Sequence, residues 1–524
     1  MIKEKIKSGK TFLGIELGST RIKASLIDDT FAPIASGSFE WENRLENGYW
    51  TYSLDDVHIG VKACYRALSE DVFTRYGIKL ETFGAIGVSA MMHGYLAFDK
   101  EDNLLTPFRT WRNTTTEDAS KILSDAFDFN IPQRWSIAHL YQAILNKEEH
   151  IDKISYITTL SGYIHYLLTG KHEIGIGDAS GMFPLCGTDY DKKMLDKFDD
   201  LVKDEKLPYK VREILPEIKV AGENDSYLTE SGALFLNPTG TLKTGILVCP
   251  PEGDAGTGMV ATNAVLPETG NISAGTSVFS MLVLKKPLKA RHPEVDIVTT
   301  PSGENVAMVH CNNCSNELDS WVNIFKEFSE LMGYKEDKST VYEKLYNLAL
   351  SGNSDGIAAF NYLSGEHITD IKEGKPMYFR LPEKKMHLAD FMRAQLNSAF
   401  TTLSIGMDIL FREENVRAEL FTAHGGIFKT KGVAQKILAD ALDTPVAVME
   451  TSGEGGAWGM ALLAAYAVLG GDKALGEWLE CEVFKNNKGT VINPEKEAVM
   501  NFNNYKKLFL SGLKAESVLE EIKG

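Results

Sequence analysis

Two segments of the chain carry the same pattern of apolar and polar positions, about half the chain length apart. Thr11–Leu17 and Ile22–Ile27 are apolar runs of strand length on either side of a short polar turn. Gly270–Leu284 repeats this pattern around the turn Gly275-Thr-Ser. A repeat at this spacing predicts two units of related topology, each built on a β-hairpin.

Short apolar runs and amphipathic stretches follow each hairpin. We expect strands at Phe83–Ser89, Ile246–Pro250, Leu420–Ala423 and Pro445–Met449, and helices at Asp390–Phe411, at Gly432–Leu442, over much of 115–170 and along the small-residue run from Gly455. This alternation predicts an α/β protein with mixed sheets. The pattern restarts beyond Ala261, which places the two units at 1–261 and 262–524, the second with a charged, peripheral tail after Gly470.

Composition narrows the classes of partner. The chain has 524 residues and a net charge of −17, and a length of this order fits two domains. The negative charge argues against a nucleic acid or an anionic membrane, because both need a basic surface. We find no signal peptide and no apolar run long enough to span a bilayer. The six scattered cysteines are typical of reduced thiols, so we expect a cytoplasmic protein.

The turns of the two hairpins are candidate phosphate sites. A tight Gly-Ser/Thr turn leaves backbone N–H groups pointing outward, which suits a phosphate. One such turn alone is more often an ordinary β-turn. Two turns with matching flanking strands favour a nucleotide held by both units. The chain contains neither a Walker-type Gly-x-x-x-x-Gly-Lys-Ser/Thr sequence nor a Gly-x-Gly-x-x-Gly sequence after a strand.

Two acidic residues are candidates for chemistry. Asp254 follows an apolar strand in the glycine-rich sequence Gly-Asp-Ala-Gly-Thr-Gly, and strand ends are where α/β proteins place their ligands. It is a candidate general base, with a helix cap as the simpler alternative. Glu16 lies on an otherwise apolar strand, where a carboxylate is costly to bury unless it is paired or near a metal. A hydrated Mg²⁺ beside a phosphate would suit it.

An ordered set of motifs resembles the FGGY family of carbohydrate kinases, within the superfamily of sugar kinases, Hsp70 and actin. The resemblance covers nearly the whole chain. Its motifs are the first hairpin, Ser89-Ala-Met-Met-His-Gly94, Trp111-Arg-Asn-Thr114, Asp178-Ala-Ser180, Gly253-Asp254, Gly275-Thr-Ser277, Tyr362-Leu-Ser-Gly-Glu366, Gly425-Gly426 and the helix from Glu454 to Ala464. The resemblance implies two actin-like (ribonuclease H-like) α/β lobes with a cleft between them, the first for the sugar and the second for the nucleotide.

The resemblance also implies a role for particular residues. Asp254 would deprotonate a sugar hydroxyl, and Glu16 and Asp254 would serve Mg²⁺, with ATP as the phosphate donor. Met92, His93, Trp111 and Asn113 would line the sugar site. Phosphates would be held by Gly18, Ser19, Thr20, Gly275 and Thr276, and the adenosine by Gly425 and Gly426. Because many relatives are dimers, a homodimer is the default expectation.

Three departures from the family pattern concern the substrate. The family usually has aspartate at the position of Glu16, glutamine at Met91 and aspartate at Asn113. We expect a ketose kinase, with a pentulose such as xylulose first. Ribulose, fuculose, rhamnulose, glycerol and other polyols stay open, as does a non-catalytic, actin-like, nucleotide-dependent sensor. The spacing of Cys311 and Cys314 suggests a metal or a redox site. The absence of a second pair at zinc-site spacing disfavours a metal.

Overall fold

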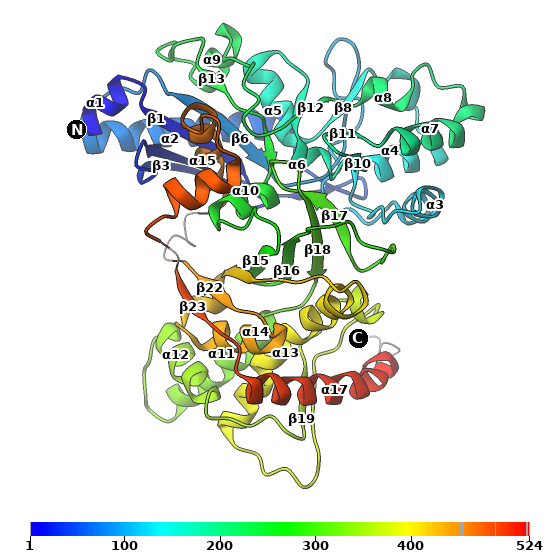
Figure 1. Ribbon diagram of the computed structural model, residues 1–524, viewed down its shortest axis with the longest axis vertical. Coiled ribbons are helices and arrows are strands. Elements are labelled where there is room, and N and C mark those ends of the chain that lie inside the picture. The colour runs from blue at the N-terminus through cyan, green and yellow to red at the C-terminus, as the bar shows by residue number, and fades with distance from the viewer. Residues whose placement is uncertain (1, 450–454, 488, 520–521, 523–524) are drawn as a thin grey trace. The chain divides into compact units, whose positions relative to one another are not determined.

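The computed structural model describes residues 2–449, 455–487, 489–519 and 522 (Figure 1). The chain forms two compact units. The first comprises Met1–Val265, Ile297–Val306 and Glu454–Asn486, and the second comprises Leu266–Asp296, Ala307–Gly453 and Asn487–Gly524. The first change of unit, at Val265, falls close to the boundary predicted at 261. Two later segments return to the first unit, which the sequence pattern does not indicate.

The first sheet surrounds the first hairpin. Its strand order is β13-β6-β1-β2-β3, and β14 also pairs with β6. The strands are β1 (Thr11–Leu17), β2 (Arg21–Asp28), β3 (Pro33–Glu40), β6 (Ala85–Ala90), β13 (Leu247–Val248) and β14 (Glu252–Gly253). The central strand β1 is antiparallel to β2 and parallel to β6. The predicted strand Thr11–Leu17 therefore coincides with β1.

Helices of the first unit cover this sheet. The long helix α2 (Leu54–Tyr76) begins at Ser53, whose side chain accepts a hydrogen bond from the Asp56 N–H, and ends at Gly77 in the left-handed region. Its buried face and that of α5 share one apolar core with β1, β2 and β6. The remaining helices of this unit are α1 (Ile2–Lys7), α3 (Glu117–Phe127), α4 (Ser136–Leu145), α5 (Leu160–Thr169), α6 (Ile176–Ala179), α7 (Lys192–Leu201), α8 (Val211–Ile214), α9 (Glu230–Leu236), α10 (Asp254–Ala261), α15 (Gly455–Leu469) and α16 (Leu475–Trp478).

Short strand pairs complete the first unit. They are β4 (Arg44–Glu46) with β5 (Tyr49–Thr51), β7 (Leu96–Phe98) with β8 (Tyr156–Thr158), β9 (Glu173–Gly175) with β12 (Glu217–Lys219), and β10 (Leu185–Cys186) with β11 (Asp189–Tyr190). The segment 115–170 is largely helical, as predicted, and β8 interrupts it.

Helix α15 packs directly on the backbone of β1. A Cβ atom added to Gly14 would lie 2.1 Å from the Ala457 carbonyl oxygen and 2.3 Å from the Ala461 nitrogen, so only glycine fits there. This contact explains the small residues of α15. The sequence analysis placed this helix in the second unit, and the structure corrects that prediction because α15 packs on β1, β6 and α10. Glu454, which precedes the helix, lies outside the described residues.

The second sheet surrounds the second hairpin. Its order is β17-β18-β16-β15-β21-β22-β23. The strands are β15 (Thr269–Ala274), β16 (Val278–Val283), β17 (Asp296–Thr299), β18 (Asn305–Cys311), β21 (Leu420–His424), β22 (Val446–Val448) and β23 (Thr490–Ile492). The central strand β15 is antiparallel to β16 and parallel to β21, as β1 is to β2 and β6. The repeat predicted from the two hairpins is thus confirmed at the level of sheet topology.

One helix of the second unit lies in the C-terminal segment that the sequence analysis expected to be peripheral. The helices of this unit are α11 (Asn316–Leu331), α12 (Lys338–Ala349), α13 (Leu388–Asp408), α14 (Val433–Leu442) and α17 (Lys496–Leu519), beside the hairpin of β19 (Ile357–Phe360) and β20 (Met377–Arg380). The charged tail was expected to be peripheral, but α17 buries Tyr505 and Phe509 in a core with Phe360 and Tyr362. The Tyr505 hydroxyl donates to the Ala394 carbonyl at 2.9 Å. No helix in the described part of the chain is long and apolar enough to cross a membrane.

Candidate active site

Asp254 lies where the first sheet ends. Strand β14 pairs in parallel with β6, with Gly253 opposite Ala90, and this pairing brings Asp254 beside the residues that follow β6. Its Oδ1 accepts a hydrogen bond from the Met92 N–H at 3.1 Å. The residue is partly buried, and this hydrogen bond anchors its carboxylate. Pairing of strands thus joins two motifs that are far apart in sequence.

Glu16 shares this site. It lies on β1 opposite Ser89 of β6. A Cβ atom added to Gly456 would lie 1.6 Å from the Glu16 Oε2, so the first turn of α15 leaves room for this carboxylate only because residue 456 is glycine. Among the described residues, Glu16 has no hydrogen-bond donor, and Lys23 is the cation that stabilises its charge.

The charge of Asp254 disfavours the charged form of Glu16. The pKa of Glu16 is raised to about 7, first by burial and then by the neighbouring charge of Asp254, against the opposing effect of Lys23. Burial also raises the pKa of Asp254 to about 6, although the N–H groups of Met92 and Ala255 oppose this. Two buried carboxylates with so little compensating charge form an oxygen donor set that suits a hard cation such as Mg²⁺.

Two further acids of this region, Glu252 and Asp178, are buried. Burial raises the pKa of Glu252 to about 8 and that of Asp178 to about 6. The sequence analysis noted Asp178 within a motif but assigned it no role, and it missed Glu252. The sequence did contain a signal for Glu252. It is an acidic residue between the apolar run Ile246–Cys249 and Gly253-Asp254, where a carboxylate is buried together with the strand.

His93 has a strained backbone. Its φ is +70°, in the left-handed region that a histidine rarely adopts, and Gly94 follows with φ +97°. The ring is buried, its Nδ1 lies 3.2 Å from the Gly181 carbonyl oxygen, and it stacks on Trp135 with centroids 6.3 Å apart. Strain of this kind persists only where the surroundings hold it, and it clusters at functional sites. The predicted sugar residues Met92 and His93 therefore lie directly beside Asp254.

The side chain of Asn113 bonds backbone groups of its own unit. Its Oδ1 accepts from the Trp50 N–H at 2.8 Å, and its Nδ2 donates to the carbonyl oxygens of Trp50 and Thr110, both at 2.9 Å. The residue is buried, and its amide is hydrogen-bonded to these backbone groups. The contacts make Asn113 a support of Trp50, and its place in the sugar site stays a prediction. Trp111 is partly exposed, and its Nε1 donates to the Ser19 Oγ at 3.3 Å.

The first predicted phosphate turn is held by its carbonyl groups. Trp41 Nε1 donates to the Gly18 carbonyl at 2.7 Å, and the Tyr52 hydroxyl donates to the Ser19 carbonyl at 2.5 Å. The N–H groups of Ser19 and Thr20 find no acceptor among the described residues. A turn that is fixed through its carbonyls and keeps N–H groups available is suited to an anion.

The second predicted turn lies in the second unit and is supported by the start of α11. The N–H groups of Cys314 and Ser315 donate to the carbonyls of Thr276 and Gly275, both at 3.0 Å. Space around Gly275 is open, and Thr276 is exposed. Cys314 therefore supports the turn through its backbone. The described residues contain no cluster of three or more His, Cys, Asp or Glu side chains with the geometry of a metal site.

Gly425 and Gly426 follow β21 in the same unit. Gly425 has φ +121°, and an added Cβ atom would lie 2.0 Å from the Ala274 carbonyl oxygen, so the end of β21 touches the end of β15. The space around Gly426 is open. Glycine is thus required at 425 by close backbone approach, and the open position at 426 would accept a flat group.

Comparisons with known proteins agree with this geometry. Residues 11–235 match the N-terminal domain and residues 270–468 the C-terminal domain of the FGGY family of carbohydrate kinases. The chain belongs to this family. Its members are phosphotransferases that use ATP as the phosphate donor, so the kinase prediction is confirmed at the level of the family.

The individual relatives share only a low sequence identity with this chain. A xylulose kinase of Haemophilus influenzae is 24% identical over 533 aligned positions, which cover 96% of this chain and 99% of the relative. The fold resembles that of a protein from Brucella ovis described as a xyloylose kinase, with 19% identity, a TM-score of 0.78, and coverage of 97% and 100% of the two chains. It also resembles a gluconate kinase from Lactobacillus acidophilus, with 17% identity, a TM-score of 0.75, and coverage of 97% and 98%. These structures confirm the predicted actin-like fold class of this FGGY chain, and the two proteins are described as kinases of different substrates.

Proposed function

We propose that this FGGY kinase transfers the terminal phosphoryl group of ATP to a hydroxyl group of a ketose, with a pentulose such as xylulose as the first candidate. The observation that carries the proposal is the carboxylate of the partly buried Asp254, anchored to the Met92 N–H next to His93. A carboxylate in this position can accept the proton of a hydroxyl group held beside His93. The name of the Haemophilus influenzae relative favours xylulose among the ketoses.

In the proposed reaction, Asp254 takes the hydroxyl proton while the sugar oxygen bonds to the terminal phosphorus and ADP leaves. Positioning and charge stabilisation do most of the catalytic work in such transfers. The N–H groups of Ser19 and Thr20, the turn at Gly275 and Thr276, and the glycines at 425 and 426 are our candidates for holding the nucleotide. The carboxylates of Glu16 and Asp254 fit Mg²⁺, which would neutralise phosphate charge when bound.

A panel of sugars tests the proposal. Purified protein with ATP and Mg²⁺ is expected to release ADP at least about tenfold faster with one ketose than without sugar, since the reaction needs an acceptor hydroxyl in place. The panel contains D-xylulose, ribulose, fuculose, rhamnulose, gluconate and glycerol, and mass spectrometry identifies the phosphorylated product. ADP release that no sugar accelerates would contradict the kinase proposal and favour a nucleotide-dependent sensor.

The acid pair predicts a pH profile. A base acts only when it is unprotonated, and burial raises the pKa of Asp254 to about 6 and that of Glu16 to about 7. We therefore expect kcat/KM for the sugar to be constant above about pH 8 and to fall as the pH drops from 7 to 5, up to about tenfold per unit. Initial rates in buffers of constant ionic strength measure this. A profile that stays flat down to pH 5 would assign ordinary carboxyl pKa values to the pair.

A further inference from the structure

The carboxylate of Glu252 joins two segments of the first unit. Only 1% of the residue is exposed. Its Oε1 accepts from the Gly177 N–H at 3.2 Å, and its Oε2 accepts from the N–H groups of Asp178 at 3.1 Å and Gly253 at 3.3 Å. Gly177 and Asp178 belong to α6, whereas Glu252 itself lies on β14, two residues before Asp254.

Two glycines reserve the space for this carboxylate. An added Cβ atom would lie 2.5 Å from the Glu252 Oε1 at Gly175, and 2.4 Å from its Oε2 at Gly177. The Gly175 N–H also donates to the Pro251 carbonyl at 2.7 Å. The sequence Gly175-Ile-Gly177 is thus fitted around Glu252, and the two segments are joined through both backbone and side chain.

The segment around α6 that Glu252 contacts also supports His93. The Gly181 carbonyl lies 3.2 Å from the His93 Nδ1. The Asp178 carboxylate faces the His93 N–H and accepts from the hydroxyl groups of Thr159 and Ser161. One end of the Glu252 side chain is therefore tied to the support of His93, and its own backbone leads into Asp254.

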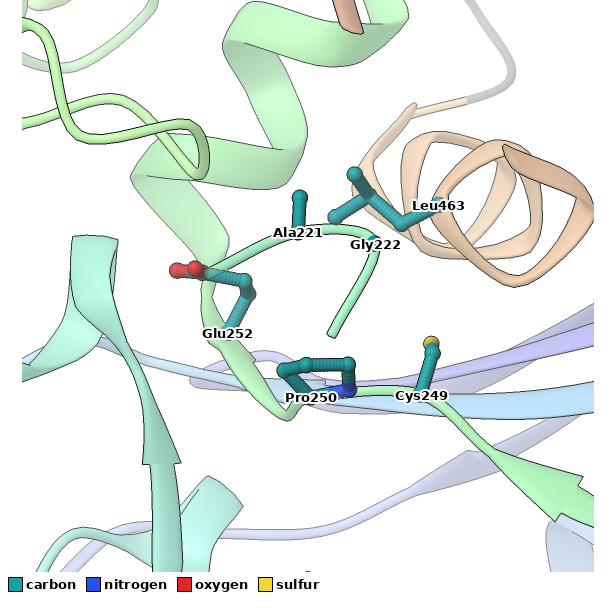
Figure 2. A pocket seen from close by; sticks show the side chains of 6 residues that line it. All are labelled: Ala221, Gly222, Cys249, Pro250, Glu252 and Leu463. Atoms are coloured by element: carbon teal, nitrogen blue, oxygen red, sulfur yellow. The ribbon is translucent and has the colours of Figure 1, made fainter. Parts of the chain in front are cut away.

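The surroundings of Glu252 favour a single side-chain position. A cavity of about 10 Å³ adjoins it and is lined by Ala221, Gly222, Cys249, Pro250, Glu252 and Leu463 (Figure 2). The carboxyl oxygens point away from Cys249 and Leu463, so the aliphatic part of the side chain faces this cavity (Figure 2). A space of this size holds at most about one water molecule. Because the side chain has so little space to move into, its carboxylate keeps the hydrogen bonds from the N–H groups of α6.

We infer that Glu252 is a positioning residue, which fixes the catalytic base Asp254 relative to the sugar-binding His93 by joining the Gly253-Asp254 turn to α6. The inference rests on the proposed function. It differs from a general structural role because its effect concerns the sugar and not ATP. Misplacement of a reacting group by about 1 Å can lower a rate on the order of 100-fold.

Kinetics of two variants test the inference. Glu252→Ala removes all three acceptor contacts, and Glu252→Gln keeps the size and one acceptor oxygen. With D-xylulose, or the panel sugar that the wild type phosphorylates fastest, we expect Glu252→Ala to lower kcat/KM for the sugar about 10- to 100-fold. The KM for ATP should stay within about twofold, and more ADP than sugar phosphate should form. Glu252→Gln should recover part of the loss.

Glu173→Gln is the matched control. Glu173 is also a buried acid of the first unit. It accepts from Ser226 and lies 3.2 Å from His165, and neither of these partners belongs to α6 or to the Gly253-Asp254 turn. We expect its sugar kinetics to stay within about twofold of the wild type, even where its melting temperature falls. Hydrogen exchange provides a readout without substrate, since the amides of Gly177 and Asp178 should lose protection in Glu252→Ala only.

The outcomes separate the inference from the proposed function. A wild type inactive on every sugar overturns the proposed function and the inference with it. An active wild type, with a folded Glu252→Ala that keeps normal sugar kinetics and equal yields of ADP and sugar phosphate, overturns the inference alone. If Glu252→Ala does not fold, Gly177→Ala displaces the same carboxylate and is held to the same criteria.

Discussion

Asp254→Asn is expected to lower sugar phosphorylation by at least about 100-fold, within the range that general-base catalysis contributes. The amide has nearly the shape of the carboxylate, and its oxygen can still accept from the Met92 N–H. It cannot take the proton of the attacking hydroxyl. The measurement is sugar phosphate formation under saturating ATP, with calorimetry of ADP binding on the same preparation.

The control for this prediction is the nucleotide. Because the hydrogen bond from Met92 survives in the variant, the fold should persist, and ADP should bind with an affinity within a few fold of the wild type. A substitution of similar shape at the far end of α10, Thr262→Val, changes a buried residue whose hydroxyl donates to the carbonyls of Gly258 and Met259, and it should retain most of the turnover. Near-normal turnover by Asp254→Asn would show that another group accepts the proton.

Glu16→Gln is expected to change stability and activity in opposite directions. The amide carries no charge to bury, so the melting temperature of the ligand-free protein should rise by about 2 to 4 °C, equivalent to about 1 kcal/mol in a unit of this size. Turnover should fall on the order of 100-fold, as when one electrostatic contact to a transferring phosphoryl group is removed. Thermal melts and initial rates on one preparation measure both effects.

The stability gain of Glu16→Gln should depend on pH. Burial raises the pKa of Glu16 to about 7 in the folded protein, above the ordinary value near 4.5 of the unfolded chain. Its charge therefore destabilises the wild type fully above about pH 7 and not at all below about pH 4.5. The difference in melting temperature should be largest near pH 8 and shrink toward pH 5. A difference independent of pH, or a variant that melts earlier, would contradict the electrostatic account.

Local patterns were enough to predict the two hairpins. Strand β1 coincides with the predicted Thr11–Leu17, and β15 and β16 lie within a residue of the apolar runs of the second hairpin. Period-two and continuous apolar runs are local signals that need no knowledge of distant contacts. The motifs around Met92, His93 and Gly253-Asp254 could likewise be placed at strand ends, where ligands bind in α/β proteins.

Contacts between distant segments account for what the sequence pattern missed. The tail after Gly470 looks polar because α17 buries only one face, with Tyr505 and Phe509 inward. Helix α15 was assigned to the second unit by its position in the chain, whereas its packing against Gly14 places it in the first. The hydrogen bonds of Asn113 to the backbone of Trp50 and Thr110 are likewise contacts that no local pattern contains.

The amino-acid sequence alone determined the two related hairpins, the α/β class and Asp254 as the candidate base, because each depends on residue types at short spacing. Its ordered motifs also carried the resemblance to the kinase family. Only the tertiary structure decided which acids share the site. Glu16 and Asp178 come from segments far from the stretch that carries Glu252 and Asp254, and strand pairing with β6 and the contact of Glu252 with α6 bring them together. Their raised pKa values follow from that common burial, which no local pattern contains.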